Sequence, residues 1–98
     1  MTVILKFQST GSIPGNGNPV TIKGTGLTIG RGSENELVLP DPNRELSKRH
    51  CAIEDNKGNV TIVDFSTNGT FLNYGKLALG LTPTPLNDGD VISIGPYE

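Results

Sequence analysis

Basic side chains gather in one short part of the sequence. All three arginines, Arg31, Arg44 and Arg49, lie within 19 consecutive residues, and Ser47 and Lys48 stand among them. An arginine guanidinium presents a planar fork of donors that matches the oxygens of a phosphate or a carboxylate. The grouping therefore indicates an anion-binding site. The alternative, in which the arginines form a solvated surface paired with nearby carboxylates, stays open at this point.

The stretch "SKRH" also places a hydroxyl near the only histidine of the chain. Ser47 and His50 are the residue types of a nucleophile and its base, which a hydrolase brings within hydrogen-bond reach beside an acid and an oxyanion hole. Two side chains three positions apart on an extended strand point to opposite faces, so only a turn would bring them together. A structural role for both residues is the competing interpretation.

A further polar group lies in "DFSTNGTFLN", residues 64–73. Asn68-Gly69 favours a tight turn, and Ser66, Thr67 and Asn68 place hydroxyl and amide groups at its tip. Such donors and acceptors suit the main chain of an extended peptide. A plain turn is the simpler interpretation, and the choice depends on whether this tip lies beside the basic cluster.

The glycine-rich segments do not match nucleotide-binding motifs. Gly69–Leu77 has five residues between its glycines instead of four and ends in leucine, which a Walker loop does not allow. Gly24-Thr25-Gly26 is followed by Ile29 where the dinucleotide fingerprint needs glycine. Nucleic-acid binding is also disfavoured, because the sequence pI is near 5.3 and the basic cluster is compact and lacks interleaved aromatic residues.

Length and composition favour one small domain, residues 1–98, with a modest core and no room for a large cofactor. The chain has 13 glycines and 7 prolines and no long segment with helical periodicity, so helix is not expected to dominate. A single cysteine, Cys51, excludes an intrachain disulfide, and a single histidine leaves no zinc cluster. No apolar run is long enough to span a bilayer, so we expect a cytoplasmic protein without membrane insertion.

Short β-type segments alternate with turn residues, which predicts an all-β fold, an antiparallel β-sandwich. The segment 60–65 has apolar residues in both phases, so it is either buried on both faces or bulged. The chain stops directly after a strand-like segment, so we expect a fragment of a longer protein. The expected strands are Val3–Gln8, Val20–Lys23, Leu27–Arg31, Leu37–Leu39, His50–Glu54, Val60–Phe65, Phe71–Asn73 and Val91–Ile94.

Three separated pieces of the sequence together resemble a forkhead-associated (FHA) domain. They are Gly30-Arg31, Ser47-x-x-His50 and the run 66–71, "STNGTF". The phrases "LTIGR", "LPDP" and "LNDGDVISIG" occur in the order and spacing of that family, and the resemblance covers nearly the whole chain. It implies a sandwich of about eleven short strands, the last of which is either short in this protein or truncated in this sequence, that recognises phosphothreonine in a partner protein and is not an enzyme.

Carried over to this sequence, the resemblance implies a phosphate site built on the basic cluster. Arg31 would bond the phosphate, and Ser47 would donate its hydroxyl to it. Lys48 and Arg49 would flank the phosphate. No metal or cofactor is implied.

The resemblance also implies roles for residues around the phosphate. Thr67 would help to fix the loop and the phosphate environment, and Asn68 would hold the peptide main chain. Glu45 would help to select a peptide residue beyond the phosphothreonine, with an acid there favouring a basic one. The residues implied to support the site are Gly30, His50 and Gly69.

Within the family, the sequence is similar to the FHA modules of bacterial type VI secretion-associated proteins. That similarity implies an N-terminal module of a longer cytoplasmic protein that answers to a companion Ser/Thr kinase. Two alternatives stay open: a scaffold of the same fold that binds its partners without phosphate, and a nucleic-acid-binding domain.

Overall fold

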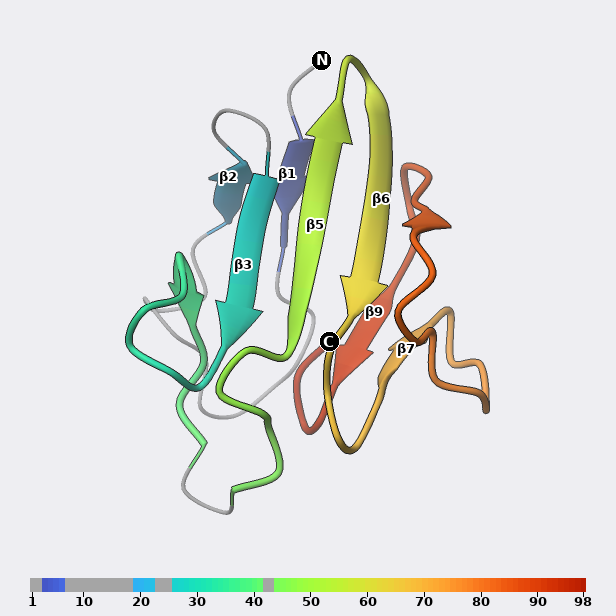
Figure 1. Ribbon diagram of the computed structural model, residues 1–98. Helices are drawn as coiled ribbons and strands as arrows, with labels where there is room; N and C mark the ends of the chain where they lie inside the picture. The colour runs from blue at the N-terminus through green and yellow to red at the C-terminus, as the bar shows by residue number, and fades with distance from the viewer. Residues whose placement is uncertain (1–2, 7–18, 23–25, 42–43) are drawn as a thin grey trace.

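The computed structural model describes residues 3–6, 19–22, 26–41 and 44–98, which form strands joined by turns and loops (Figure 1). Among these residues no helix has the length and apolar character needed to cross a membrane. The all-β class predicted from the sequence is confirmed. The strands are β1 (Val3–Leu5), β2 (Val20–Ile22), β3 (Gly26–Gly30), β4 (Leu37–Val38), β5 (Cys51–Asn56), β6 (Asn59–Asp64), β7 (Thr70–Leu72), β8 (Thr84–Pro85) and β9 (Ile92–Ile94).

The strands build a β-sandwich from one large sheet and two small ones. The large sheet has the order β4-β3-β5-β6-β8, and the small sheets pair β1 with β2 and β7 with β9. In Figure 1, β3, β5 and β6 stand in front of the small sheets. The pairs are antiparallel as predicted, except that β3 and β4 run parallel.

Each of the eight expected segments overlaps a strand, whereas β8 has no counterpart in the sequence prediction. The segment "TPTPL" gives no strand signal, because proline cannot donate a hydrogen bond to a sheet. Thr84 and Pro85 nevertheless pair with β6 at the edge of the large sheet. Three residues at the ends of expected strands, Phe7, Gln8 and Lys23, lie outside the described residues. The resemblance implied about eleven strands, and the described residues hold nine.

The hairpin of β5 and β6 forms the centre of the large sheet. The two strands pair over six consecutive residue pairs without a bulge. Lys57 and Gly58 connect them with positive φ values of 54° and 90°, the two-residue turn whose twist matches that of the strands. Ile62 and Val63 are both buried, although they point to opposite faces. The strand is therefore not bulged, and it is covered on both faces at Ile62 and Val63, whereas Phe65 beyond its end is 38% exposed.

The core lies between the layers and fixes the position of the loops. Ile29, Ile53 and Ile62 come from three neighbouring strands and are at most 2% exposed. Each such side chain stabilises the fold by about 1.5–3 kcal/mol. Because β5 runs antiparallel to both β3 and β6, the end of β3, the start of β5 and the end of β6 meet at one edge, the lower edge in Figure 1.

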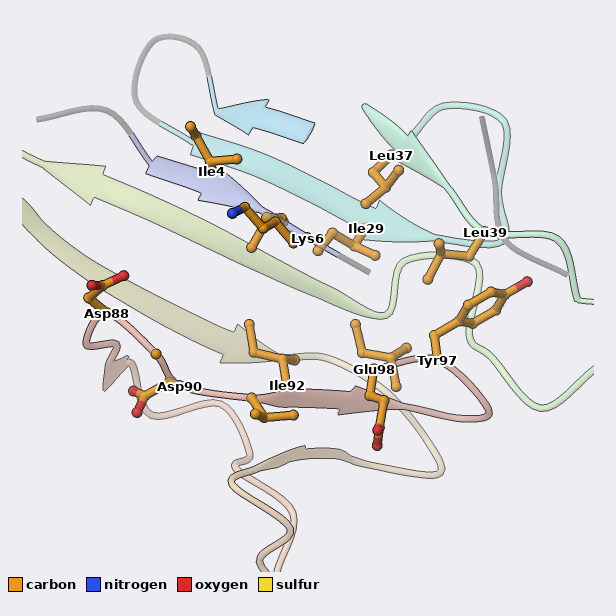
Figure 2. Close-up of a pocket in the computed structure, with 14 residues that line it drawn as sticks. Ile4, Lys6, Ile29, Leu37, Leu39, Asp88, Asp90, Ile92, Tyr97 and Glu98 are labelled. Carbon is orange, nitrogen blue, oxygen red and sulfur yellow. The ribbon is translucent and has the colours of Figure 1, made fainter. Parts of the chain in front are cut away.

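A cavity of about 320 Å³ opens between β1 and β9 on the inner face of the large sheet (Figure 2). Most of its lining is apolar and includes Ile29 and Leu39 together with Ile4 and Ile92 from the two small sheets. The second layer of the sandwich is therefore not one continuous sheet in the described residues.

Candidate functional site

Three loops meet at the lower edge of the large sheet in Figure 1, which we call the rim. They are residues 31–36 after β3, the described part of residues 39–50 before β5, and residues 65–69 after β6. The first two loops are joined by the main chain, since the amide of Arg31 donates to the carbonyl of Ser47 over 3.2 Å.

Side chains join the second loop to the third. The amide of Thr67 donates to the Ser47 hydroxyl oxygen at 3.0 Å. The Asn68 carboxamide donates to the carbonyl of Glu45 at 2.9 Å. Arg31, Ser47 and Asn68, which are distant in the sequence, thus lie at one rim.

The Arg31 guanidinium contacts the rest of the protein through its Nε atom. Its Nε donates to the carbonyl of Leu46 at 2.8 Å and lies 4.0 Å from a carboxylate oxygen of Asp41. The side chain is 29% exposed, and its two terminal amino groups have no hydrogen-bond partner among the described residues. They are donors with fixed positions at the surface, which is what an anion site requires.

Asp41 organises the loop that holds Arg31, a role that the sequence did not reveal. Its two carboxylate oxygens accept the amides of Glu45 and Leu46 at 2.8 and 2.7 Å. The Asp41 side chain is only 3% exposed. The available signal was the Asp-Pro pair of "LPDP", because aspartate often closes a turn with main-chain amides.

His50 links the second loop to the third loop and to β3 from a fully buried position. Its Nδ1 accepts the amide of Ser47 at 3.1 Å, and its Nε2 donates to the carbonyl of Gly69 at 3.0 Å. These partners assign the neutral imidazole with its proton on Nε2. The His50 amide and carbonyl also bond Ile29 and Phe65, at 2.8 Å each.

This arrangement contradicts the hydrolase interpretation of Ser47 and His50. Both ring nitrogens of His50 are occupied by main-chain groups, so neither can take a proton from the Ser47 hydroxyl. The hydroxyl instead accepts the amide of Thr67. Its own hydrogen is available to a ligand, and the serine can act as a donor but not as an activated nucleophile.

Asp64, at the end of β6, fixes the third loop. Its carboxylate accepts the amide and hydroxyl of Ser66 at 3.0 and 2.5 Å, and the hydroxyl and amide of Thr70 at 2.9 and 3.1 Å. A fifth bond comes from the amide of Gly80 at 3.4 Å. Burial raises the pKa of Asp64, but the hydrogen bonds from Ser66 and Thr70 outweigh it and hold the pKa below its usual value.

At the tip of the third loop, Ser66 supports the loop, whereas Thr67 and Asn68 lie at the surface. Ser66 points inward, since its hydroxyl donates to Asp64 and accepts the amide of Gly69 at 2.7 Å. The prediction that Ser66 offers its hydroxyl at the tip is therefore wrong. Thr67 and Asn68 are exposed.

Two glycines permit close approach of the main chain. A Cβ on Gly30 would overlap the carbonyl oxygen of Lys48 and lie 2.8 Å from Nδ2 of Asn35. Gly69 has a φ of +102°, and a Cβ there would lie 2.8 Å from the ring of Phe71. Asn35 is buried and donates to two carbonyls, those of Gly32 and Lys48. It is a second supporting residue that the sequence did not reveal.

The remaining predicted site residues surround the rim in different ways. Lys48 is exposed, and the guanidinium of Arg49 lies 4.4 Å above the ring centre of Phe65, on the third loop. Glu45 is exposed, with its amide and carbonyl both used in the rim. Arg44 is exposed as well. The described residues contain no group of three His, Cys, Asp or Glu that could hold a metal ion.

Comparison with known families and proteins gives consistent matches. The family model for the FHA domain matches residues 27–95. The chain is 36% identical over 78 residues to the E3 ubiquitin-protein ligase CHFR of Danio rerio, a match over 78% of this chain and 12% of the relative. It is 38% identical over 87 residues to an FHA domain-containing protein of Arabidopsis thaliana, over 86% of this chain and 22% of the relative. The chain thus spans about a tenth to a fifth of the length of these relatives.

A solved structure has the same fold. The N-terminal FHA domain of S. cerevisiae Rad53p, in complex with a phosphothreonine peptide, superposes with a TM-score of 0.76 at 26% identity. The match covers 95% of this chain and 82% of that chain.

Proposed function

The chain belongs to the forkhead-associated (FHA) family, and on that premise we propose that it recognises phosphothreonine in partner proteins without catalysing a reaction. The observation that carries the proposal is the convergence of Arg31, Ser47 and Asn68 at one rim. A phosphothreonine brings a charge of about −1.5 to −2 and three acceptor oxygens. The terminal amino groups of Arg31 and the hydroxyl of Ser47 are the donors that such a group needs.

The solved relative supports the same class of ligand. That FHA domain, from Rad53p, is bound to a phosphothreonine peptide. The ligase activity in the name of the Danio rerio relative is not part of the proposal, because the match spans 12% of its length.

The other rim residues receive the following roles in the proposal. Asn68 holds the peptide main chain with the carboxamide groups that Glu45 does not use. Lys48 adds a positive charge from an exposed position beside the phosphate, and Arg49, stacked on Phe65, adds a second one.

Five residues act behind or beside the phosphate site. Thr67 fixes the Ser47 hydroxyl through its amide, and Glu45 favours a basic residue of the peptide. His50 supports the site by joining the loops. The glycines that permit close approach of the main chain are Gly30 and Gly69.

The biological setting is proposed from the sequence resemblance. We place the module in a longer cytoplasmic protein that a companion Ser/Thr kinase regulates, with type VI secretion as the process. Identification of the parent protein's other domains and of its phosphorylated partner tests this setting separately from the binding activity.

The binding proposal is tested by titrating one peptide in its phosphothreonine, phosphoserine and unphosphorylated forms. We expect binding in the order phosphothreonine, then phosphoserine, with no binding of the unphosphorylated peptide. Arg31→Ala should weaken phosphothreonine binding by about tenfold or more, since a charge-assisted hydrogen bond contributes roughly 1.5–3 kcal/mol. Arg44→Ala is the matched control, because it removes the same charge from an exposed arginine of the rim.

Each alternative function has its own outcome in this titration. Equal loss in Arg31→Ala and Arg44→Ala, with retention of the protein on a polyanion column, would indicate general electrostatic binding as in a nucleic-acid-binding domain. Equal affinity for the phosphorylated and unphosphorylated peptides would indicate a scaffold that binds without phosphate.

A further inference from the structure

Asn68 and Gly69 form a pair that is prone to a covalent reaction within the chain. The main-chain nitrogen of the glycine attacks the side-chain carboxamide of the asparagine, since a residue without a Cβ leaves room for the approach. A bond forms from that nitrogen to Cγ, the C–N bond of the carboxamide breaks, and the NH2 group takes up a proton and leaves as ammonia. Water then opens the cyclic imide to aspartate, or to isoaspartate, in which the main chain runs through the side-chain carboxyl carbon.

The folded structure occupies the nitrogen that would attack. The amide of Gly69 donates to the Ser66 hydroxyl oxygen at 2.7 Å, and this hydroxyl donates to the Asp64 carboxylate at 2.5 Å. Gly69 is also buried, whereas Asn68 is exposed. The nitrogen becomes a nucleophile only after it loses its proton, and a negative charge there would lie close to the charge of Asp64, which is unfavourable. The hydrogen bond to Ser66 therefore opposes the first step.

The leaving group is occupied as well. The Asn68 carboxamide nitrogen donates to the carbonyl of Glu45 at 2.9 Å, which ties it to the second loop of the rim. Loss of ammonia ends this bond, just as deprotonation of Gly69 ends the bond to Ser66. The reaction therefore requires the third loop to leave both partners, and its rate depends on how often this loop opens.

We propose that Asn68 is a site of spontaneous deamidation, that the Ser66 hydroxyl suppresses the reaction in the folded domain, and that completion of the reaction ends phosphopeptide binding. The last part rests on the proposed function. A carboxylate at position 68 has no hydrogen to donate to the carbonyl of Glu45, and it adds a negative charge at the rim proposed to bind a phosphate. Isoaspartate also lengthens the main chain of the loop.

The same geometry makes the reaction sensitive to the ligand. In the proposed function, the Asn68 carboxamide holds the main chain of the bound peptide, so an occupied rim opens less often than an empty one. Deamidation thus inactivates domains without a partner sooner than domains that hold one.

The first test compares the folded domain with a synthetic peptide of residues 64–73 at pH 8, with mass spectrometry to measure aspartate and isoaspartate at position 68. We expect the reaction in the folded domain to be slower by about ten- to a hundredfold, because both hydrogen bonds must break first. In Ser66→Ala the reaction of the folded domain should be about three- to tenfold faster than in the wild type.

Thr70→Val is the matched control for Ser66→Ala. It removes another hydroxyl that donates to the Asp64 carboxylate, at 2.9 Å, but leaves the bond between the Gly69 amide and Ser66 in place. Urea unfolding measures the stability that each variant loses. Thr70→Val should deamidate at close to the wild-type rate even when its loss of stability equals that of Ser66→Ala.

The second test follows binding. The capacity of the wild type to bind a phosphothreonine peptide should fall in step with the fraction modified at position 68, and freshly prepared Asn68→Asp should not bind. A saturating phosphothreonine peptide should slow the reaction severalfold, whereas its unphosphorylated form should leave the rate unchanged.

Each contrary result has a distinct meaning. The protective role of the fold is overturned if the folded wild type reacts as fast as the synthetic peptide, a comparison that holds even if Ser66→Ala does not fold. Equal acceleration in Ser66→Ala and Thr70→Val would overturn the role of Ser66 and assign the effect to lost stability. Full binding by Asn68→Asp would overturn the consequence for the ligand. Failure of fresh, unmodified protein to bind any phosphothreonine peptide would instead refute the proposed function and leave the measured deamidation rates standing.

Discussion

Replacement of Asp64 by asparagine is expected to destabilise the domain by about 2–4 kcal/mol at pH 7. The carboxylate accepts five hydrogen bonds, from Ser66, Thr70 and Gly80. Asparagine keeps one oxygen and turns an NH2 group toward the donors on the other side. The side that faces Thr70 and Gly80 holds two main-chain amides, which cannot act as acceptors. Each lost bond to a charged acceptor costs about 1.5–3 kcal/mol, and relief of the buried charge offsets part of the sum.

The contribution of the Asp64 carboxylate to folding stability should decrease at low pH. The pKa of Asp64 is lower in the folded protein than its ordinary value, because hydrogen bonds to the carboxylate outweigh the effect of burial. Its contribution to stability is therefore complete above about pH 4, the ordinary pKa of an aspartate, and is lost as the pH falls through the lowered folded value. The stability gap between the wild type and Asp64→Asn should narrow between pH 4 and pH 2.

Urea unfolding followed by far-ultraviolet circular dichroism measures this gap at pH 7, 4 and 2. Asp88→Asn is the control, since it makes the same chemical change at an exposed carboxylate near β9 and should alter the free energy of unfolding by less than about 0.5 kcal/mol. A gap that stays constant from pH 7 to pH 2, or equal losses in the two variants, would refute the role given to the Asp64 carboxylate.

Two further predictions follow from the packing around the rim. Gly30→Ala should destabilise the domain by about 3 kcal/mol and weaken phosphopeptide binding, because the new methyl would overlap the carbonyl of Lys48. Gly75→Ala, whose methyl would lie 3.1 Å from the nearest carbonyl, should cost less in the same urea titration. Cys51 should react with a thiol reagent at pH 8 at least about a hundredfold more slowly than in urea-unfolded protein, since burial, with the nearby Asp64 charge, raises its pKa to about 12. Rapid labelling of the folded protein would contradict this.

The fold was largely predictable because alternation and turn residues are local signals. The hairpin around Lys57 and Gly58 shows this, since the turn and the strands on both sides can be read from adjacent residues. The parallel pairing of β3 with β4 and the addition of β8 were not predictable in this way. Which strands pair with each other depends on contacts that no local pattern in the sequence records. In addition, β4 and β8 have only two residues each, which is too few to show the alternation of apolar and polar side chains typical of a strand.

The candidate site was indicated by residue type only in part. Three arginines in one short segment point to an anion, but this signal does not distinguish Arg31 from Arg44 and Arg49, and the family resemblance was needed to single out Arg31. The supporting residues gave no such signal. Asp41 and Asp64 accept main-chain amides inside the protein, yet an aspartate at a turn looks the same in a sequence whether it is buried or solvated. The full burial of His50, whose ring bonds main-chain groups of Ser47 and Gly69, is likewise not indicated by its residue type.

Residues at the rim serve the fold and the proposed ligand with different atoms. Arg31 uses Nε to bond Leu46 and keeps its terminal amino groups for the surface. The Ser47 oxygen accepts an amide and keeps its hydrogen, and Asn68 uses one amide hydrogen and keeps the other groups of its carboxamide. Because these side chains are already ordered, a ligand does not have to immobilise them, which otherwise costs about 0.5–1.5 kcal/mol for each. A lysine at position 31 would carry the charge, but all of its donors lie on one nitrogen, so it could not bond Leu46 with one atom and present two further nitrogen atoms to the phosphate.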